Sequence, residues 1–257
     1  KLTVAVPLNC WNIHRTGIQT NPSARLKPCT WIKRGCLPVI TILRLNTYYS
    51  NADYTLTVLS DVVADSPASW AQSEVDAAIN KGLVPPELQN SYERNISRKD
   101  FCHLVVNLLT VKMGKSIYEI LEINGKQYKL SELIAAFYDT DDEKVYCAYK
   151  LGIVNGRGNR IFDPDGYITR EEAAVMLHRT AMVLGFTEPN GTPQYFNDSD
   201  KFSSWAINGI FFASSATDRT NGNRVMGGTG NGNFSPKGYY TRQQAYITMI
   251  RLYNAMD

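Results

Sequence analysis

Apolar residues recur with the period of an α-helix in three stretches of the chain, and polar residues occupy the positions between them. Because residues three and four positions apart share one face of a helix, each stretch predicts an amphipathic helix whose apolar face lies in the core. The apolar positions are, in chain order, Phe101, Val105, Leu108 and Leu109, then Ala174, Leu177, Ala181 and Leu184, then Ala245, Met249 and Leu252.

Each of these predicted helices begins with a capping signal. A serine or threonine stands at the N-cap, and a residue with a carboxylate or amide side chain follows three positions later, as in a capping box. Asp100, in the first of these pairs, is only a near match to the glutamate or glutamine of that motif. The pairs are Ser97 with Asp100, Thr169 with Glu172, and Thr241 with Gln244.

The three predicted helix starts belong to an internal repeat. Arg98, Arg170 and Arg242 each follow an N-cap, and they are evenly spaced because 170 − 98 and 242 − 170 are both 72. At the same offset the second and third copies match without a gap through a glycine-rich loop and into the helix, whereas the first copy has no glycine in its loop at 85–90. The sequence therefore predicts three copies of one unit.

Each unit is predicted to be a helix, a loop and a second helix. The first helices are expected near residues 68–81, 143–151 and 204–214, each after an acidic or serine-rich cap. Two helices of about a dozen residues cannot enclose a core alone, so the copies must pack on one another. We therefore expect a mainly all-α fold of three helix-loop-helix repeats, at residues 61–112, 138–186 and 187–257.

Two segments lie outside the repeats. Residues 113–137 form an insertion in which the Asn124-Gly125 pair suggests a hairpin turn, with a short helix over residues 116–123 as the alternative. Residues 1–60 show no persistent period and are broken by prolines, so we expect a poorly structured basic leader with one short strand over residues 39–45.

Charge and composition exclude several classes of protein. The net charge of +3 is the sum of +6 over residues 1–60 and −3 over residues 61–257, so it does not by itself indicate a nucleic-acid partner. No apolar run is long enough for a membrane-spanning helix. The five cysteines form no CxxC pair and the three histidines no HExxH motif. We therefore expect no nucleic acid, membrane insertion, metal, cofactor or catalytic residue.

The repeated arginine is the strongest candidate for chemistry. A cation at the first position of a helix is disfavoured by about 0.3–1 kcal/mol, because the helix N-terminus carries partial positive charge. Its presence in all three copies suggests that Arg98, Arg170 and Arg242, with the free N–H groups of the helix ends, converge on an anion such as a carboxylate or phosphate. Alternatively, each arginine pairs with a carboxylate of the neighbouring repeat.

The glycine loops and two tryptophans are further candidates. The loops permit positive φ and close approach of a ligand to the backbone, or they are simply tight connections. The tryptophans, in identical Ser-Trp-Ala triplets, would stack on a sugar ring or line a core or groove wall. The candidates are Gly156, Gly158 and Asn159 in the second copy, Gly228, Gly230 and Asn231 in the third, and Trp70 and Trp205.

Together these motifs resemble the S-layer homology domains of bacterial surface proteins, which usually occur as three tandem copies. The resemblance covers about residues 60–257. It departs from the family pattern in the glycine-free loop of copy one, the absence of tryptophan from copy two, and Gln243-Gln244 in place of an acidic pair in copy three. The matching segments are Ser60-Asp61 with residues 67–71, residues 151–156 and 162–164 with 168–173, and residues 226–228 and 234–236 with 240–242.

The resemblance implies a three-pronged helical assembly with pseudo-threefold symmetry, in which grooves between prongs bind anionic secondary cell-wall polysaccharide, often through a pyruvate ketal. It also implies that the arginine after each cap and the glycine loops contact this polymer, which is attached to peptidoglycan. We therefore expect a non-catalytic module that anchors an exported protein on the surface of a Gram-positive or related bacterium. The alternative is a self-associating structural module whose arginines bridge repeats.

Overall fold

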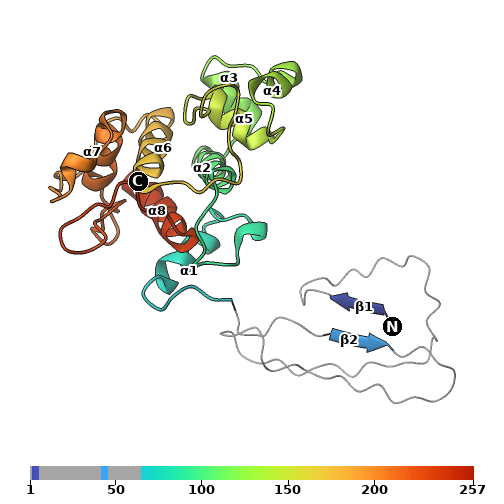
Figure 1. Cartoon of the computed structure of the whole chain (residues 1–257), viewed down its shortest axis with the longest axis horizontal. Coiled ribbons are helices and arrows are strands. Elements are labelled where there is room, and N and C mark those ends of the chain that lie inside the picture. Colours follow the sequence, from blue (N-terminus) through green and yellow to red (C-terminus); the bar gives the residue numbers. More distant parts are fainter. Residues whose placement is uncertain (1, 6–41, 46–64) are drawn as a thin grey trace. The chain divides into compact units, whose positions relative to one another are not determined.

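The computed structural model describes residues 2–5, 42–45 and 65–257 (Figure 1). The first two segments form an antiparallel pair of strands, β1 (Leu2–Ala5) and β2 (Ile42–Leu45), with Leu2 opposite Leu45. The strand predicted over residues 39–45 is thus found over its last four residues. The remaining predictions for the leader fall outside the described residues.

Residues 66–257 form one unit built from helices, which confirms the prediction of a mainly helical fold. In this unit no helix is both long enough and apolar enough to cross a membrane. The α-helices are α1 (Gln72–Asn80), α2 (Arg98–Met113), α3 (Ile117–Ile123), α4 (Leu130–Ala136), α5 (Glu143–Lys150), α6 (Arg170–Val183), α7 (Ile207–Ser215) and α8 (Arg242–Ala255), and the 3₁₀ turns are η1 (Pro86–Leu88), η2 (Ser199–Lys201) and η3 (Ser204–Ala206).

The three long helices α2, α6 and α8 start at the predicted arginines. Thr169 and Thr241 make reciprocal capping boxes, in which the side chain at N3 also accepts from the N-cap backbone N–H. Ser97 accepts a hydrogen bond from the backbone N–H of Asp100 at 3.1 Å, and its helix has no reciprocal bond. The carboxylate of Asp100 pairs instead with Arg242 at 2.9 Å, so the near match to the motif caps on one side only.

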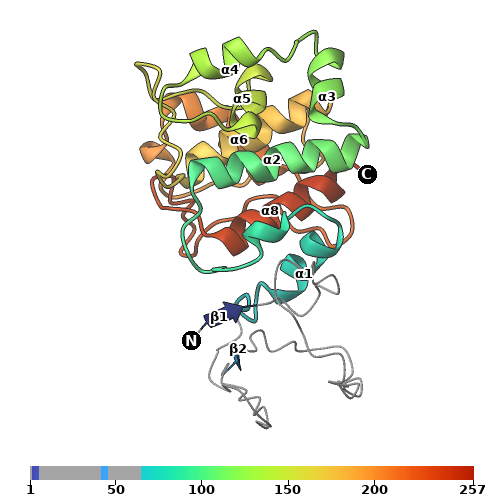
Figure 2. The same ribbon diagram turned by 90° about the vertical axis from the view of Figure 1, so that its right-hand side faces the viewer.

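The long helices bury their predicted apolar faces against one another. Helix α2 contacts both α6 and α8, and it runs beside α8 in Figure 2. All of the predicted stripe is fully or almost fully buried except Leu184, which is half-buried next to the C-terminal end of α6. The three helices therefore share one hydrophobic core.

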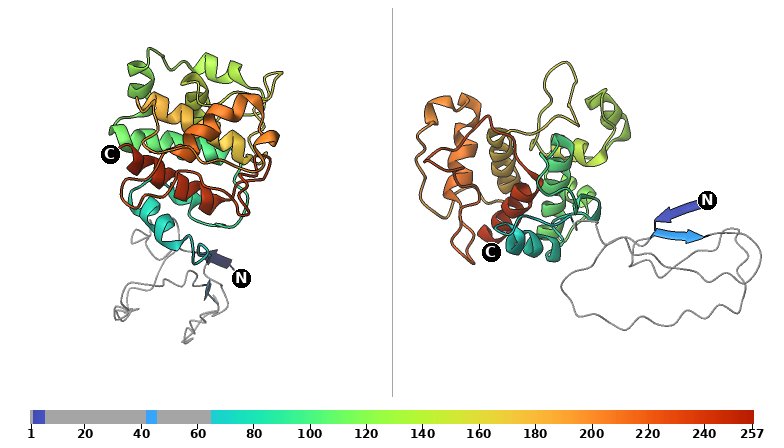
Figure 3. Two further views of the ribbon diagram at one scale, coloured as in Figure 1. Left: turned by 90° about the vertical axis from the view of Figure 1, so that its left-hand side faces the viewer. Right: turned by 60° about the horizontal axis from the view of Figure 1, so that its bottom comes forward.

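Each long helix is also covered by a short helix from a different part of the chain. Helix α5 packs on α2, α7 on α6, and α1 on α8. The last of these pairs joins opposite ends of the helical unit, and α1 and α8 lie side by side in both Figure 2 and Figure 3. No copy of the repeat therefore encloses its own core, as the length of its helices predicts.

Backbone hydrogen bonds join the three helix starts in a closed cycle. The N–H of Ile96 donates to the carbonyl of Tyr240 at 2.8 Å, that of Tyr240 to Ile168 at 3.2 Å, and that of Ile168 back to Ile96 at 3.2 Å. All three residues are buried and each lies one position before an N-cap. Because every buried N–H and carbonyl in this cycle has a partner, the segments meet without an unsatisfied polar group.

The insertion is helical, so the hairpin suggested by the Asn124-Gly125 pair is wrong and the alternative of a short helix is confirmed. Ser116 and Glu119 form a capping box at the start of α3, and Asn124 ends the helix ahead of Gly125 at φ +65°. A left-handed glycine ends a helix as readily as it turns a hairpin, which is why the pair was ambiguous. Helices α3 and α4 pack on α5 around a small second cluster of apolar side chains: Leu121, Leu133, Tyr146 and Cys147.

Candidate functional site

Two of the three repeated arginines are buried and bind backbone carbonyls of the following copy. Arg98 Nε donates to the carbonyl of Phe162 at 3.0 Å, and Arg170 Nε donates to that of Phe234 at 2.8 Å. Each guanidinium also lies over the ring of that phenylalanine, at 4.9 and 4.8 Å from its centre. Burial lowers the pKa of both arginines from its ordinary value, and a guanidinium remains cationic at neutral pH.

The backbone at these helix starts is already occupied. The N–H of Arg98 donates to the carbonyl of Gly166, and the N–H of Arg170 to that of Gly238, both at 2.9 Å. The expectation that free N–H groups at the helix ends converge on an anion is therefore wrong. Loop carbonyls of the next copy satisfy these groups, so the helix ends hold the copies together.

Arg242 also contacts a neighbouring repeat, but its partners include side-chain oxygens as well as a backbone carbonyl. Its guanidinium donates to the carbonyl and the side-chain oxygen of Asn90, at 3.1 and 2.8 Å, and pairs with the carboxylate of Asp100 at 2.9 Å. The first copy has no glycine loop, and Asn90 supplies the acceptors instead. Arg242 therefore pairs with a carboxylate of a neighbouring repeat, as the alternative interpretation predicts. Arg98 does so as well, because its Nη1 lies 3.2 Å from Oε1 of Glu172.

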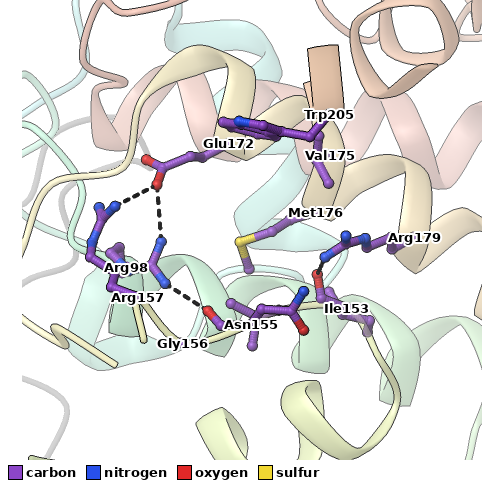
Figure 4. A pocket seen from close by; sticks show the side chains of 11 residues that line it. Arg98, Ile153, Asn155, Gly156, Arg157, Glu172, Val175, Met176, Arg179 and Trp205 are labelled. Atoms are coloured by element: carbon purple, nitrogen blue, oxygen red, sulfur yellow. Dashed lines mark hydrogen bonds and ion pairs between the residues drawn. The ribbon is translucent and has the colours of Figure 1, made fainter. Parts of the chain in front are cut away.

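A pocket of about 490 Å³ lies where four parts of the chain meet (Figure 4). Its walls are the start of α2, the segment before and within the first glycine loop, one side of α6, and η3. Three predicted residues, Arg98, Gly156 and Trp205, line it together although 107 positions separate the first from the last. The other lining residues are Ile153, Val154, Asn155, Arg157, Glu172, Val175, Met176 and Arg179.

The pocket carries an excess of positive charge. Arg98 and Arg157 both pair with one carboxylate, that of Glu172, at 3.2 and 3.0 Å (Figure 4). Arg179 stands apart from them and donates to the carbonyl of Ile153 at 3.3 Å. Within residues 65–257 it has no carboxylate partner. Arg157 also pairs with Asp163 at 3.0 Å, so Arg179 is the guanidinium of this pocket that has no carboxylate partner, which suits the binding of a carboxylate or phosphate.

Trp205 gives the pocket an exposed aromatic wall. Its side chain is 57% exposed and lies near Val175, while the matching Trp70 is 63% exposed and does not line this pocket. Neither tryptophan therefore belongs to the core, which removes one of the alternatives left open for them. A partly exposed indole offers an apolar face to a sugar ring together with an N–H donor.

The outer residues of the two glycine loops form tight turns outside this pocket. Gly158 and Gly230 have φ of +96° and +114°, and the asparagine after each, Asn159 and Asn231, lies near +50°. In each loop the glycine carbonyl accepts a hydrogen bond from the N–H three residues later, at 2.9 Å. These residues fit the alternative of a tight connection, and of the two loops it is Asn155, Gly156 and Arg157 that line the pocket.

Gly228 has the same structural requirement as Gly156. A Cβ at Gly228 would lie 2.8 Å from the carbonyl oxygen of Asn233, and one at Gly156 would lie 2.7 Å from that of Ile161. Both positions therefore exclude any side chain because the loop closes tightly on itself. Gly228 was predicted to bind a ligand, and the structure gives it this packing role.

Two functional candidates were missed in the sequence. Arg157 lies inside the first glycine loop, and Arg179 lies on the third turn of α6. A signal for Arg179 was present, because Arg251 stands at the same position of the third copy, 72 residues later. No such signal marks Arg157, since Thr229 occupies its position in the third copy.

The described residues contain neither a metal-binding cluster nor a reactive thiol. No group of three His, Cys, Asp or Glu side chains within residues 65–257 is placed to hold an ion. Burial raises the pKa of the Cys147 thiol to about 12 and also raises the pKa of Cys102, so both are protonated at neutral pH.

Comparison with known proteins gives one family match and several relatives. Residues 145–174, which include most of α5, the first glycine loop and the start of α6, match the family model of the S-layer homology domain. The chain is 25% identical over 185 residues to exoglucanase XynX of Acetivibrio thermocellus, covering 70% of this chain and 15% of that protein.

Two further relatives show the same pattern of coverage. An amylopullulanase of Thermoanaerobacterium thermosulfurigenes is 26% identical over 70% of this chain and 9% of its own length. Cell surface glycoprotein 1 of Acetivibrio thermocellus is 26% identical over 77% of this chain and 8% of its own length. The chain thus spans only a small part of each relative.

Proposed function

We propose that this chain is a non-catalytic module that anchors an exported protein to the bacterial cell envelope by binding anionic polysaccharide of the cell wall. The observation that carries the proposal is the pocket in which Arg98 and Arg157 pair with Glu172 while Arg179 has no carboxylate partner among residues 65–257, all beside the exposed ring of Trp205. A charged unit on a sugar fits both features, because the guanidinium groups bind its anion and the indole stacks on its ring.

The match to the S-layer homology domain and the similarity to a cell surface glycoprotein support the location at the cell surface. The enzymes among the relatives support a module that large exported proteins share, since each match covers at most 15% of the enzyme's length. On this proposal the ligand is secondary polysaccharide attached to the peptidoglycan of a Gram-positive or related bacterium, and a pyruvate ketal is one source of its charge.

We further propose that residues 61–257 form three S-layer homology copies related by a pseudo-threefold axis. The closed cycle of hydrogen bonds among Ile96, Ile168 and Tyr240 supports this arrangement. So does the packing of each short helix on the long helix of the preceding copy, with α1 closing the cycle on α8. Each groove is then built from residues of more than one copy.

The attraction to a polyanion is local on this account, because residues 61–257 carry a net charge of −3. Bulk electrostatics would repel the ligand, so the guanidinium groups of the pocket must supply the binding.

Co-sedimentation with purified Gram-positive cell walls tests the proposal. The unaltered chain should pellet with the walls, and Arg157→Gln combined with Arg179→Gln should remain in the supernatant. Arg160→Gln is the matched control, since it removes one positive charge from the same exposed loop outside the pocket. Retention of the double variant, or equal loss in the control, would rule out this pocket as the binding site.

The alternative of a self-associating structural module makes a different prediction. Arg98 and Arg170 do bridge copies, and a module of this kind would form concentration-dependent oligomers whose melting temperature does not respond to wall polysaccharide. Sedimentation velocity of the chain with and without the polysaccharide distinguishes the two.

A further inference from the structure

Arg179 and Arg251 occupy the same position in two copies of the repeat, yet only one of them is neutralised. Arg251 makes two parallel bonds to the carboxylate of Glu74, from Nε at 2.7 Å and from Nη2 at 2.6 Å. Arg179 has a single bond to the carbonyl of Ile153 at 3.3 Å and no ion pair among residues 65–257. The two matched positions therefore differ in the charge that they offer to a ligand. Arg170, the repeated arginine that accompanies Arg251, also has no carboxylate partner among residues 65–257, but it is buried and donates to the carbonyls of Phe234 and Gly227.

The short helices α7 and α1 dock in the same way on α6 and α8, respectively. The N–H of Ser203 donates to the Glu171 side chain at the start of α6, at 3.1 Å. At the matching positions the N–H of Ala68 donates to the Gln243 side chain at the start of α8, at 2.9 Å. Ser203 and Ala68 each lie two residues before the tryptophan of a Ser-Trp-Ala triplet. The residues that follow in α7 and α1 are therefore structurally matched.

Glu74 and Gly209 are such a matched pair, each being the fourth residue after its tryptophan. A Cβ at Gly209 would lie 2.7 Å from the Cα of Val175 in α6, closer than packed atoms approach. The close contact of α7 with α6 thus requires glycine at this position. As a result α7 places no carboxylate opposite Arg179, whereas α1 places one opposite Arg251.

The residues that correspond to the pair Arg98 and Arg179 in the remaining part of the repeat are Arg242 and Asn107, so no second arginine is present there. Asn107 stands 72 positions before Arg179, and its side-chain amide donates to the carbonyl of Gly82 at 2.6 Å. The repeated arginine of this set, Arg242, is paired with Asp100. This set therefore offers no guanidinium without a carboxylate partner.

We infer that, within residues 65–257, the pocket between Arg98 and Arg179 is the one anion-binding groove, and that Glu74 blocks the equivalent position at Arg251. This inference rests on the proposed function and specifies which groove performs it. The ligand is a sugar unit bearing a carboxylate or phosphate. At Arg251 such a group would have to displace a carboxylate that already fills the guanidinium fork, whereas at Arg179 it meets an unpaired cation.

The two exposed tryptophans allow each groove to be observed separately. The indole N–H signals of Trp205 and Trp70 in a nitrogen–proton correlation spectrum report on the two positions, and Trp→Phe variants assign them. We use trigalacturonic acid, an acidic trisaccharide, as the probe on the whole chain. Its addition should shift the Trp205 signal and leave that of Trp70 in place.

Two single substitutions should each change the response of one tryptophan signal to the trisaccharide. Glu74→Gln removes the blocking charge, so the Trp70 signal should begin to shift while that of Trp205 responds as before. Arg179→Gln should weaken the response of Trp205 at least fivefold without affecting Trp70. The other indole and backbone signals show that each variant is folded.

The outcomes separate this inference from the proposed function. Equal shifts of Trp70 and Trp205 in the unaltered chain, or a Trp70 signal that stays still in Glu74→Gln, would overturn the single-groove inference and leave the proposed function standing. Absence of any shift at either tryptophan would overturn both.

Discussion

Arg170 donates from its Nε to the carbonyl of Phe234 at 2.8 Å, across 64 residues of sequence, and Arg98 makes the same bond to Phe162 at 3.0 Å. A residue that the sequence marks as a candidate ligand-binding group is thus part of the internal structure in two copies. The buried guanidinium ties the start of one long helix to the loop before the next. Binding and stability are separable because Arg170 lies outside the pocket that contains Arg98.

Arg170→Ala is expected to destabilise the fold by about 3 kcal/mol, because it removes two hydrogen bonds from a charged group and leaves the buried carbonyl of Phe234 unpaired. At about 2–4 °C per kcal/mol for a unit of this size, the melting temperature should fall by roughly 6–12 °C. Thermal melts followed by circular dichroism measure the change.

Arg160→Ala, on the exposed surface of a loop, is the control and should melt within a degree or two of the unaltered chain. An unchanged melting temperature in Arg170→Ala would contradict the structural role of this arginine.

Neighbouring glycines in the second loop are expected to respond differently to alanine. At Gly228 a Cβ would come within 2.8 Å of the Asn233 carbonyl oxygen, whereas at Gly227 it would meet no atom within 4 Å and φ is not positive. Gly228→Ala should therefore cost about 1–3 kcal/mol and Gly227→Ala less than about 0.5 kcal/mol. Urea unfolding of the two variants gives both values, and similar values would show that the loop has room at Gly228.

Asp142 should make stability depend on pH in the acid range. Burial tends to raise its pKa, but the hydrogen bonds from His103 and from the Val145 N–H outweigh burial and hold the pKa below its ordinary value of 3.8. A carboxylate with a lowered folded-state pKa stabilises the fold above pH 3.8, and this stabilisation is lost as the pH falls through the folded-state value.

Asp142→Asn keeps a capping oxygen and removes the charge. It should be less stable than the unaltered chain at pH 6, and the difference should shrink toward zero below about pH 3. Urea midpoints at the two pH values test this expectation, and a difference that is the same at both would exclude a role for the charge.

Local signals in the sequence were sufficient to predict the three long helices and their starts, whereas α4 was not predicted. The capping pair of Thr169 and Glu172 and the apolar stripe after it act within one helix, so they predict α6 without knowledge of the fold. The pair of Ser116 and Glu119 carries the same signal for α3, and it would have decided between the helix and the hairpin in the insertion. These features depend only on residues close in sequence.

The partners of the arginines could not be predicted in this way. Whether Arg98 meets a ligand or the carbonyl of Phe162 depends on how a loop 64 residues away closes on the helix start. The pocket depends on the same closure, because it brings Trp205 of the third copy beside Arg98 of the first. The repeat did contain evidence for Arg179, through its match with Arg251, but the difference in their charge partners appears only when α1 and α7 are in place.

The central claim is that the pocket binds an anionic group on a wall polysaccharide, and isothermal titration with matched polymers tests it most directly. Soluble acidic wall polysaccharide is titrated into the whole chain, first intact and then after chemical reduction of its carboxylates to alcohols. We expect the intact polymer to bind, the reduced polymer to bind at least tenfold more weakly, and Arg157→Gln combined with Arg179→Gln to bind both forms equally weakly. Equal affinity of the unaltered chain for the intact and the reduced polymer would contradict the claim.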